Sequence, residues 1–141
     1  MLLKHTNGLK KTEIFAEYNN TQLQLIIQKM EMKMYSKGEM LVKEGDVGRE
    51  FMVIMKGTAE VSKKDKDGNS YMIKRLDSTT SRMIGEAALI NEYYRRSATV
   101  TAVSDETVVL VLTRNSYHEL QKEKTIEQKS NEKLKQIQRQ L

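Results

Sequence analysis

The sequence predicts a mainly β domain with flanking helices, in which about eight short antiparallel strands form a small β-barrel or sandwich. Two observations predict this fold. Short apolar runs, several of them alternating with period two, recur between residues 32 and 112, and glycine-containing turns separate them. Clear helical periodicity is confined to the segments before and after this region.

The composition indicates what class of protein the chain belongs to. A chain of 141 residues with 38% hydrophobic and 30% charged residues suits one folded domain. It has no cysteine and only two histidines, His5 and His118, far apart in sequence, so we expect neither a disulfide framework nor a metal site. No apolar run approaches a membrane span and no signal sequence is recognised, so we expect a cytoplasmic location without membrane insertion.

The net charge of +5 belongs to the two ends of the chain. Residues 1–12 carry three lysines and no acid, and residues 121–141 carry six basic and three acidic side chains. The segment between them sums to −1. Because the basic excess is not gathered on the body of the domain, a nucleic-acid-binding face is not expected.

The first helix is predicted over TQLQLIIQKM, residues 21–30. Thr21 and Gln24 are expected to form a capping box at its start. Its apolar face follows the helical spacing i, i+3, i+4, i+7 and consists of Leu23, Ile26, Ile27 and Met30. Just upstream, Ile14 and Phe15 are expected to form a short helical element on the same core.

The strands are predicted from the apolar runs that follow. They lie around Met32–Met34, Met40–Val42, Phe51–Met55, Thr58–Val61, Met83–Ile84, Ala98–Val103 and Thr107–Leu112, and Asp67-Gly68 signals a hairpin between Ala59–Lys63 and Tyr71–Leu76. The methionines at 32, 34, 40, 52 and 55 are expected to fill the core. The glycines at 45, 48 and 57 are interpreted as turn positions without a role in binding.

The C-terminal region is predicted to be helical. Thr113 is the expected N-cap, with Tyr117 and Leu120 on the packed face. The tail carries few apolar residues, namely Ile126, Leu134, Ile137 and Leu141, so it is expected to lie on a surface or extend freely. We therefore divide the chain into an N-terminal linker (1–12), a central domain (13–121) and a C-terminal lid or coupling helix (122–141).

The stretch IGEAALINEYYRRSATV, residues 84–100, carries the chemistry. Gly85 would let a ligand approach the backbone, and the free N–H groups of a helical turn over 87–90 would favour an anion. Arg95 or Arg96 would supply a planar fork for two phosphate oxygens, while the Glu86 carboxylate accepts from a sugar hydroxyl. Together these residues predict a pocket for a ribose phosphate. The alternative interpretation is that Glu86 and an arginine form a structural ion pair.

The same stretch resembles a known family. GEAALI…RSATV is similar to the phosphate-binding cassette of the cyclic nucleotide-binding domain, most like those of cGMP-dependent protein kinases, and KGEMLVKEGDVGREFMVIMKGTAEV resembles the upstream part of that domain. The resemblance implies a jelly-roll of strands. It implies that Glu86 holds the ribose 2′-hydroxyl and Arg96 the cyclic phosphate. Its further candidates are Gly85 and the backbone of Ala87, Ala88 and Ser97 around the phosphate, with Met83, Ile84 and Tyr71 as the wall by the base.

The sequence departs from the family pattern in the cassette. The arginine usually follows the glutamate by nine residues, whereas Arg95 lies nine and Arg96 ten residues after Glu86. Arg96 is preferred because R-S-A-T-V then falls into register. Ile84 replaces the usual phenylalanine, and the loop before it lacks the usual glycine. Ser97 favours cGMP slightly over cAMP, because the resemblance places a hydroxyl there within reach of the guanine amino group.

The function expected from these features is regulatory binding of a cyclic nucleotide, cGMP or cAMP. Binding would be transmitted through the helices after Thr113 to an attached or partner effector, such as a protein kinase or channel. No enzyme activity, cofactor or metal is expected, because no nucleophile–base constellation is recognised and Asp65, Asp67 and Asn69 fit a hairpin turn better than a calcium loop. The alternative is a ligand-free domain of this family that serves as a protein-interaction or structural module, its basic tail docking on an acidic partner.

Overall fold

The computed structural model describes residues 15–79 and 82–140, with the side chains of 123–132 and 140 left out of the description. Within that part, eight strands form two antiparallel sheets of four strands each, ordered β1-β8-β3-β6 and β2-β7-β4-β5. The strands are β1 (Glu31–Ser36), β2 (Met40–Val42), β3 (Glu50–Lys56), β4 (Thr58–Lys64), β5 (Ser70–Asp77), β6 (Met83–Ile84), β7 (Thr99–Ala102) and β8 (Glu106–Thr113), and the helices are α2 (Asn20–Lys29), α3 (Ala87–Ile90) and α4 (Arg114–Gln140).

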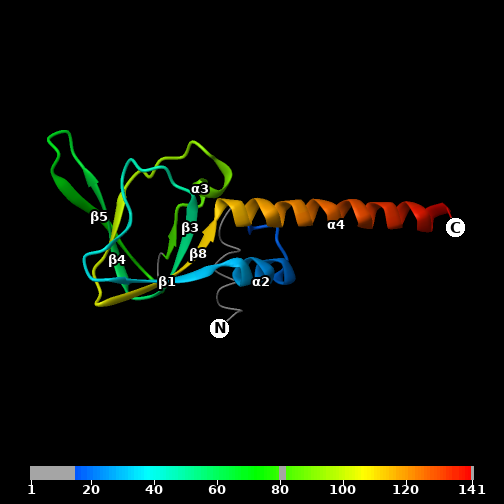
Figure 1. The fold of residues 1–141 in the computed structure, drawn as a ribbon, viewed down its shortest axis with the longest axis horizontal. Helices are drawn as coiled ribbons and strands as arrows, with labels where there is room; N and C mark the ends of the chain where they lie inside the picture. The colour runs from blue at the N-terminus through cyan, green and yellow to red at the C-terminus, as the bar shows by residue number, and fades with distance from the viewer. Residues whose placement is uncertain (1–14, 80–81, 141) are drawn as a thin grey trace.

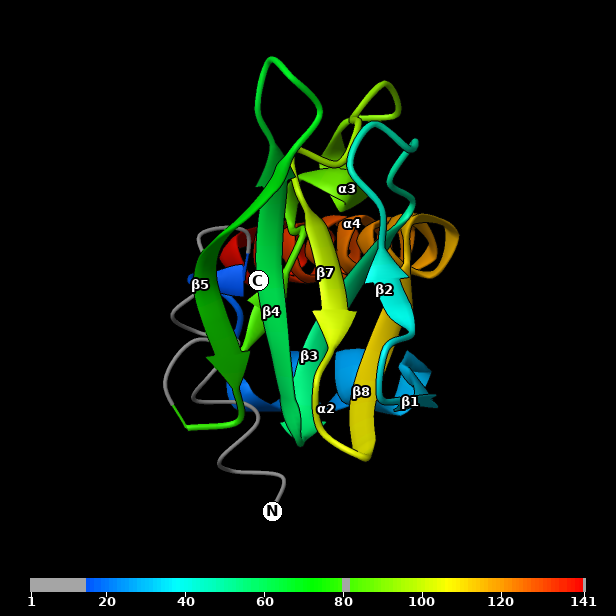
Figure 2. The same ribbon diagram turned by 90° about the vertical axis from the view of Figure 1, so that its left-hand side faces the viewer.

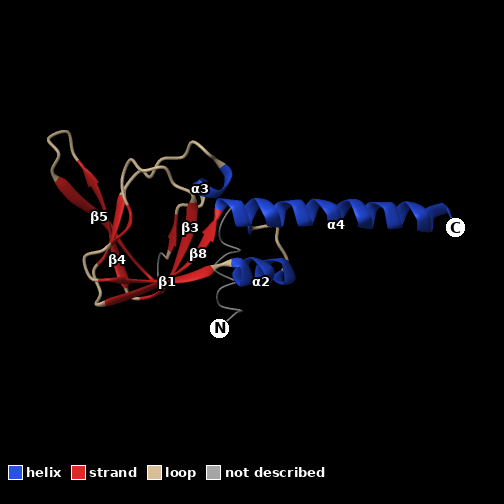
Figure 3. Ribbon diagram, in the orientation of Figure 1, coloured by secondary structure: helices blue, strands red, loops and turns tan. Residues whose placement is uncertain are grey.

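The sheets and helices form layers. Figure 1 shows the strands at one end of the molecule and α4 extending away from them, and Figure 2 shows the β2-β7-β4-β5 sheet in front of the other sheet. The helices gather on the far side of the β1-β8-β3-β6 sheet, as the colouring by secondary structure in Figure 3 makes plain. The predicted mainly β fold with flanking helices is therefore confirmed.

Two apolar clusters stabilise this arrangement, and β3 and β8 contribute to both. Alternate residues of β3 point to opposite faces. Met52 and Ile54 belong to the cluster between the two sheets. Phe51 and Val53 instead join the cluster beneath the helices, which contains Phe15, Leu23, Ile26, Leu89, Leu112, Tyr117 and Leu120. The same two strands thereby fix the helical layer on one side and the second sheet on the other.

The N-terminal helix begins earlier than predicted. Its N-cap is Asn19, whose Oδ1 accepts from Gln22 N at 2.8 Å while Gln22 Oε1 accepts from Asn19 N at 2.9 Å. The capping box predicted at Thr21 and Gln24 is thus wrong by two residues. Phe15 does lie in a short helical turn and is fully buried, with its ring edge-to-face against Tyr18 and Tyr117. Ile14 falls outside the described residues.

The prediction that all five methionines fill the core is wrong for three of them. Met32 and Met34 on β1 are 69% and 61% exposed, and Met40 is also exposed. β1 is the edge of its sheet, and the helices pack on β3 and β8 without a β1 residue entering their cluster. Met52 is buried and Met55 is half-buried. The alternation of apolar residues thus predicted strand β1 correctly, but the helices do not pack on its apolar face.

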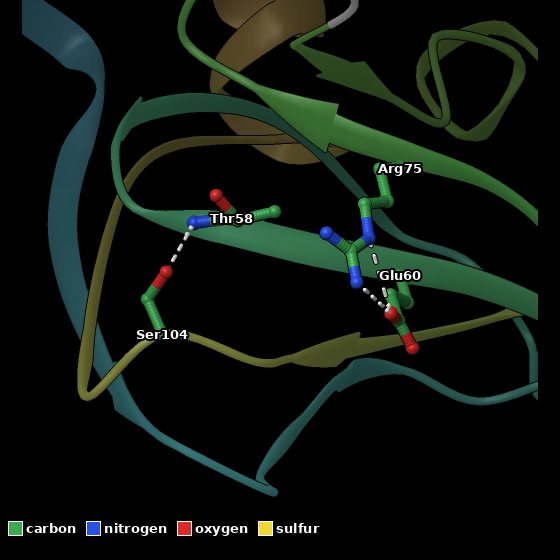
Figure 4. A network of polar contacts seen from close by, with 4 residues as sticks. All are labelled: Thr58, Glu60, Arg75 and Ser104. Atoms are coloured by element: carbon green, nitrogen blue, oxygen red, sulfur yellow. Dashed lines mark hydrogen bonds and ion pairs between the residues drawn. The ribbon is translucent and has the colours of Figure 1, made fainter.

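The β4–β5 hairpin confirms the interpretation of Asp67-Gly68. Asp65 Oδ1 accepts from the backbone N–H groups of Asp67 and Asn69, both at 2.9 Å, so these residues form the turn itself. Across the two strands, Arg75 donates from Nε and Nη2 to Glu60 Oε1 at 3.2 and 3.1 Å, and Thr58 N donates to Ser104 Oγ at 2.9 Å (Figure 4). The Arg75–Glu60 contact joins the two strands of the hairpin, and the Thr58–Ser104 bond ties the hairpin to the β7–β8 connection.

The C-terminal helix α4 starts at the predicted cap and is a single helix of 27 residues. Thr113 Oγ1 accepts from Ser116 N at 3.2 Å, and Tyr117 and Leu120 are buried as expected. Leu134 and Ile137 are exposed, whereas the Ile126 side chain and Leu141 fall outside the described residues. Among described residues, no helix is both long and apolar enough to cross a membrane.

Packing of α2 predicts a sharp contrast between two neighbouring leucines. Leu23 is fully buried and Leu25 is 44% exposed on the same helix. Leu23→Ala should lower the free energy of unfolding by about 2–5 kcal/mol, because it removes buried atoms and leaves a cavity. Leu25→Ala should change it by less than about 0.5 kcal/mol. Urea denaturation of both variants measures the difference, and equal losses would contradict this account of the core.

Candidate functional site

A cavity of about 190 Å³ lies between the β2-β7-β4-β5 sheet and the segment that carries β6 and the two arginines. Its walls are mostly apolar, with four polar side chains among them. The lining residues are Val42, Val61, Lys74, Leu76, Met83, Ile84, Gly85, Tyr94, Arg96, Ser97, Ala98 and Val100. An apolar cavity with a few convergent polar groups is the usual form of a small-molecule site.

Five of the nine residues predicted for the site line this cavity, namely Met83, Ile84, Gly85, Arg96 and Ser97. Glu86 stands at the N-cap position of the short helix α3 without a side-chain cap hydrogen bond, and α3 contains Ala87 and Ala88. Tyr71 does not line the cavity: it is half-exposed on β5, close to the hairpin turn and opposite Lys63. The cavity also takes in Tyr94 and Lys74, which the sequence did not single out.

Arg96 is the central polar residue of the cavity. It is only 6% exposed, and its Nη2 donates to the Glu50 backbone carbonyl at 2.7 Å. The guanidinium carbon lies 5.8 Å from the centre of the Tyr94 ring. Burial lowers the pKa of Arg96, with Tyr94 and Glu50 opposing the shift. Among the described residues, no carboxylate forms an ion pair with it, so a buried cation is held by a neutral carbonyl and a ring.

The two arginines are used differently. Arg95 is exposed, and its Nη1 donates to the Gly45 carbonyl at 3.0 Å. Arg96 is buried and lines the cavity. Its backbone pairs with the same loop, since Arg96 N donates to Asp46 O and Gly45 N to Arg96 O, both at 2.8 Å. Arg96 therefore lines the cavity and Arg95 does not.

Two glycines make room for the Arg96 side chain. A Cβ atom on Gly48 would lie 2.8 Å from both Arg96 Nε and Tyr94 Cδ1, and one on Gly85 would collide with Arg96 Nη1. Gly85 also has a φ of +71°, which side chains with a Cβ rarely adopt. Gly48 does not have a positive φ, so a turn does not require glycine there. Glycine is needed because a Cβ atom would collide with Arg96. The interpretation of Gly48 as a turn glycine unrelated to the site is therefore wrong.

Two polar atoms near the cavity are buried without a partner among the described residues: Glu86 Oε2 and Arg96 Nη1. Such atoms are rare in folded proteins and call for an explanation. The alternative of a structural ion pair between Glu86 and Arg96 does not provide it, since no such pair is found in the described chain. A ligand with a hydroxyl donor and an anionic group would satisfy both atoms.

The backbone amides around α3 are only partly free. Ala88 N, one of the amides predicted to bind a phosphate, already donates to Gly85 O at 3.0 Å. For Ala87 N and Ser97 N, no acceptor is found within the described residues. These two amides, together with Arg96, are the donors that this part of the structure leaves for an anion.

Arg114 connects the cavity wall to α4. Its Nε donates to Ala88 O at 2.7 Å, and its Nη2 donates to Gly48 O at 2.5 Å and to Asn91 O at 3.1 Å. The first residue of α4 therefore holds the end of α3 and the loop beside Arg96. Sequence reasoning identified the helix start but not this contact, because the partners are backbone carbonyls that carry no sequence signal.

No group of three or more acidic, histidine or cysteine side chains that could hold a metal is found among the described residues. The cavity itself contains one cationic fork, one lysine and two hydroxyl groups. This set of donors suits an anionic organic ligand.

Comparisons with known proteins identify what the chain resembles. Residues 32–124 match the family model of the cyclic nucleotide-binding domain. Human cGMP-dependent protein kinase 2 is 26% identical over 117 residues, which is 82% of this chain and 15% of that protein. The cAMP-dependent protein kinase regulatory subunit of Mycosarcoma maydis is 33% identical over 94 residues, 67% of this chain and 17% of that protein.

A solved structure shows the same relationship. The cAMP-bound structure of PfPKA-R superposes with a TM-score of 0.72 at 26% identity, over 84% of this chain and 41% of that one. The chain thus spans less than half of these relatives' length, as little as 15% of the human kinase. The matched region includes Glu86, Arg96 and both sheets. The chain belongs to the cyclic nucleotide-binding domain family.

Proposed function

We propose that this chain is a regulatory domain that binds a cyclic nucleotide, with cGMP slightly favoured over cAMP. Binding would be transmitted through α4 to an attached or partner effector in the cytoplasm, such as a protein kinase or channel. The observation that supports this best is Arg96: a buried cation with an unpartnered Nη1, at a cavity beside a glutamate with an unpartnered Oε2.

The cyclic phosphate would bind at Arg96. A buried arginine without a carboxylate pays a desolvation penalty that an anionic ligand offsets. The phosphate carries a single charge and offers two exposed oxygens to the guanidinium fork. The amides of Ala87 and Ser97 would complete its coordination, and the lack of a side chain at Gly85 leaves room for the Arg96 guanidinium.

The ribose would lie against Glu86. Its carboxylate is an acceptor only, and Oε2 is already desolvated, so a 2′-hydroxyl that donates to it restores a hydrogen bond without a new desolvation cost. A deoxyribose ligand lacks that donor and would leave the carboxylate unsatisfied.

The base would pack on the apolar wall and be read by Lys74 and Ser97, which lie on that wall. A lysine ammonium is a donor only. Guanine presents two acceptors on one edge, N7 and O6, whereas adenine presents N7 with an amino donor. Lys74 thus favours guanine, and the Ser97 hydroxyl is expected to favour it by accepting from the guanine amino group.

Transmission would start at Arg114. Pockets for small ligands commonly exceed about 300 Å³, whereas this cavity is about 190 Å³, so binding would require the segment around α3 to shift. Arg114 ties the carbonyls of α3 to the start of α4, so such a shift changes the position that α4 prefers. In this account residues 13–121 form the binding unit and residues 122–141 the coupling helix.

Calorimetric titration with cGMP and cAMP tests the phosphate site. The wild-type chain should bind at least one nucleotide with micromolar or tighter affinity. Arg96→Ala should weaken binding about 100-fold or more, because it removes a buried charge partner of the phosphate. Arg95→Ala is the matched control and should change affinity less than about threefold, as expected for an exposed charge.

The structure of each variant is checked by its cooperative thermal transition, so that loss of binding is not confused with unfolding. No heat with either nucleotide in a folded wild-type chain would overturn the proposal. It would favour the ligand-free interaction module instead.

The base assignment predicts a change in selectivity. Lys74→Gln and Ser97→Ala should each lower the ratio of cGMP to cAMP affinity by about fivefold, as expected for one hydrogen bond. Lys63→Gln, on the neighbouring strand β4 and outside the cavity lining, should leave the ratio unchanged. Competition of the two nucleotides for a fluorescent analogue measures the ratio. An unaltered ratio in both site variants would show that neither side chain reads the base.

A further inference from the structure

A second cavity, of about 460 Å³, lies where β8 passes into α4. Every residue that lines it has a polar or charged side chain: Lys33, Arg49, Glu50, Thr113, Arg114 and Asn115. None of these residues lines the cavity that contains Arg96. The two cavities therefore share no lining residue, although Glu50 O accepts from Arg96 and Arg114 Nε donates to Ala88 O.

The charge of this second cavity is strongly unbalanced, with three cationic side chains against one carboxylate. The Glu50 carboxylate lies 3.5 Å from Lys33 Nζ, and the two side chains are 33% and 46% exposed, so this pair is weak. The Arg114 guanidinium donates to carbonyl oxygens, which leaves its charge uncompensated. For the Arg49 side chain, no hydrogen bond or ion pair is found among the described residues.

The backbone around the second cavity holds these cations in place. Arg49 O accepts from Arg114 N at 2.8 Å, and Glu50 pairs with Thr113 across β3 and β8. Thr113 caps α4, and the positive end of that 27-residue helix adds to the potential at the same point. Arg49 and Arg114 are thus fixed neighbours at their main chains. The Arg49 fork suits a phosphate better than a simple halide, and Arg114, whose Nε and Nη2 bind backbone carbonyls, adds positive charge.

We propose that the second cavity binds a phosphate group, carried either by a small phosphate ester or by a phosphorylated side chain of a protein. Arg49 and Lys33 flank the group, and Arg114 with the start of α4 forms the floor of the site. Glu50 turns from Lys33 to solvent when the phosphate enters. This inference does not depend on cyclic nucleotide binding, and its test contains no cyclic nucleotide.

The test is a ¹⁵N–¹H NMR titration of the full chain with inorganic phosphate at constant ionic strength. The amide signals of Arg49 and Asn115 should shift and saturate. Arg49→Gln should weaken that binding by about three- to fivefold, because it removes one exposed cation from the site. Lys66→Gln is the control: it removes the same charge from the β4–β5 turn and should leave the binding curve unchanged.

A phosphoserine peptide and its unphosphorylated form distinguish the two sources. Tighter binding of the phosphoserine peptide than of inorganic phosphate indicates a phosphorylated protein partner, whereas equal or weaker binding indicates a small phosphate ester. The proposal is overturned by shifts that do not saturate, by equal weakening in Arg49→Gln and Lys66→Gln, or by an unphosphorylated peptide that binds as well as the phosphorylated one.

Discussion

The burial of the Arg96 guanidinium, with no carboxylate partner among the described residues, is the constraint around which the site is built. Its side chain passes between Gly48 and Gly85, where any larger residue would collide with it. Its backbone pairs with the loop at Gly45 and Asp46, and its Nη2 donates to the Glu50 carbonyl. A charge held this way is costly in the absence of an anion. The proposed ligand phosphate would bind Arg96 Nη1, which has no partner among the described residues.

The position of β3 explains how a change at the Arg96 cavity could reach α4. Its first residue, Glu50, accepts from Arg96, pairs with Thr113 and carries the carboxylate of the second cavity. Directly after Thr113, Arg114 starts α4 and holds the carbonyls of α3. The proposed nucleotide site, the second cavity and the base of the C-terminal helix thus meet within a few residues. A shift of α3 would be felt at α4 without a long chain of contacts.

Short sequence patterns were sufficient to predict the structure of segments that depend only on their own residues. The hairpin at Asp67-Gly68 and the cap at Thr113 were predicted correctly. The local sequence was not sufficient to predict features that depend on residues far away in the chain. NNTQLQ contains two overlapping capping patterns, and the structure uses the one formed by Asn19 and Gln22. Met32 and Met34 have the strand period but lie on an edge strand that the helices do not cover. Gly48 does not have a positive φ. It must be glycine because a Cβ atom there would collide with the side chain of Arg96, which lies far along the chain.

The central proposal is that Arg96 binds the phosphate of a cyclic nucleotide. The most direct measurement is the guanidinium ¹⁵N spectrum of the arginine-labelled chain, with Arg96 assigned from an Arg96→Lys sample, recorded before and after addition of cGMP. The account predicts that the Arg96 signals move on binding and acquire a coupling to ³¹P. Unchanged Arg96 signals in a sample that demonstrably binds cGMP would contradict it.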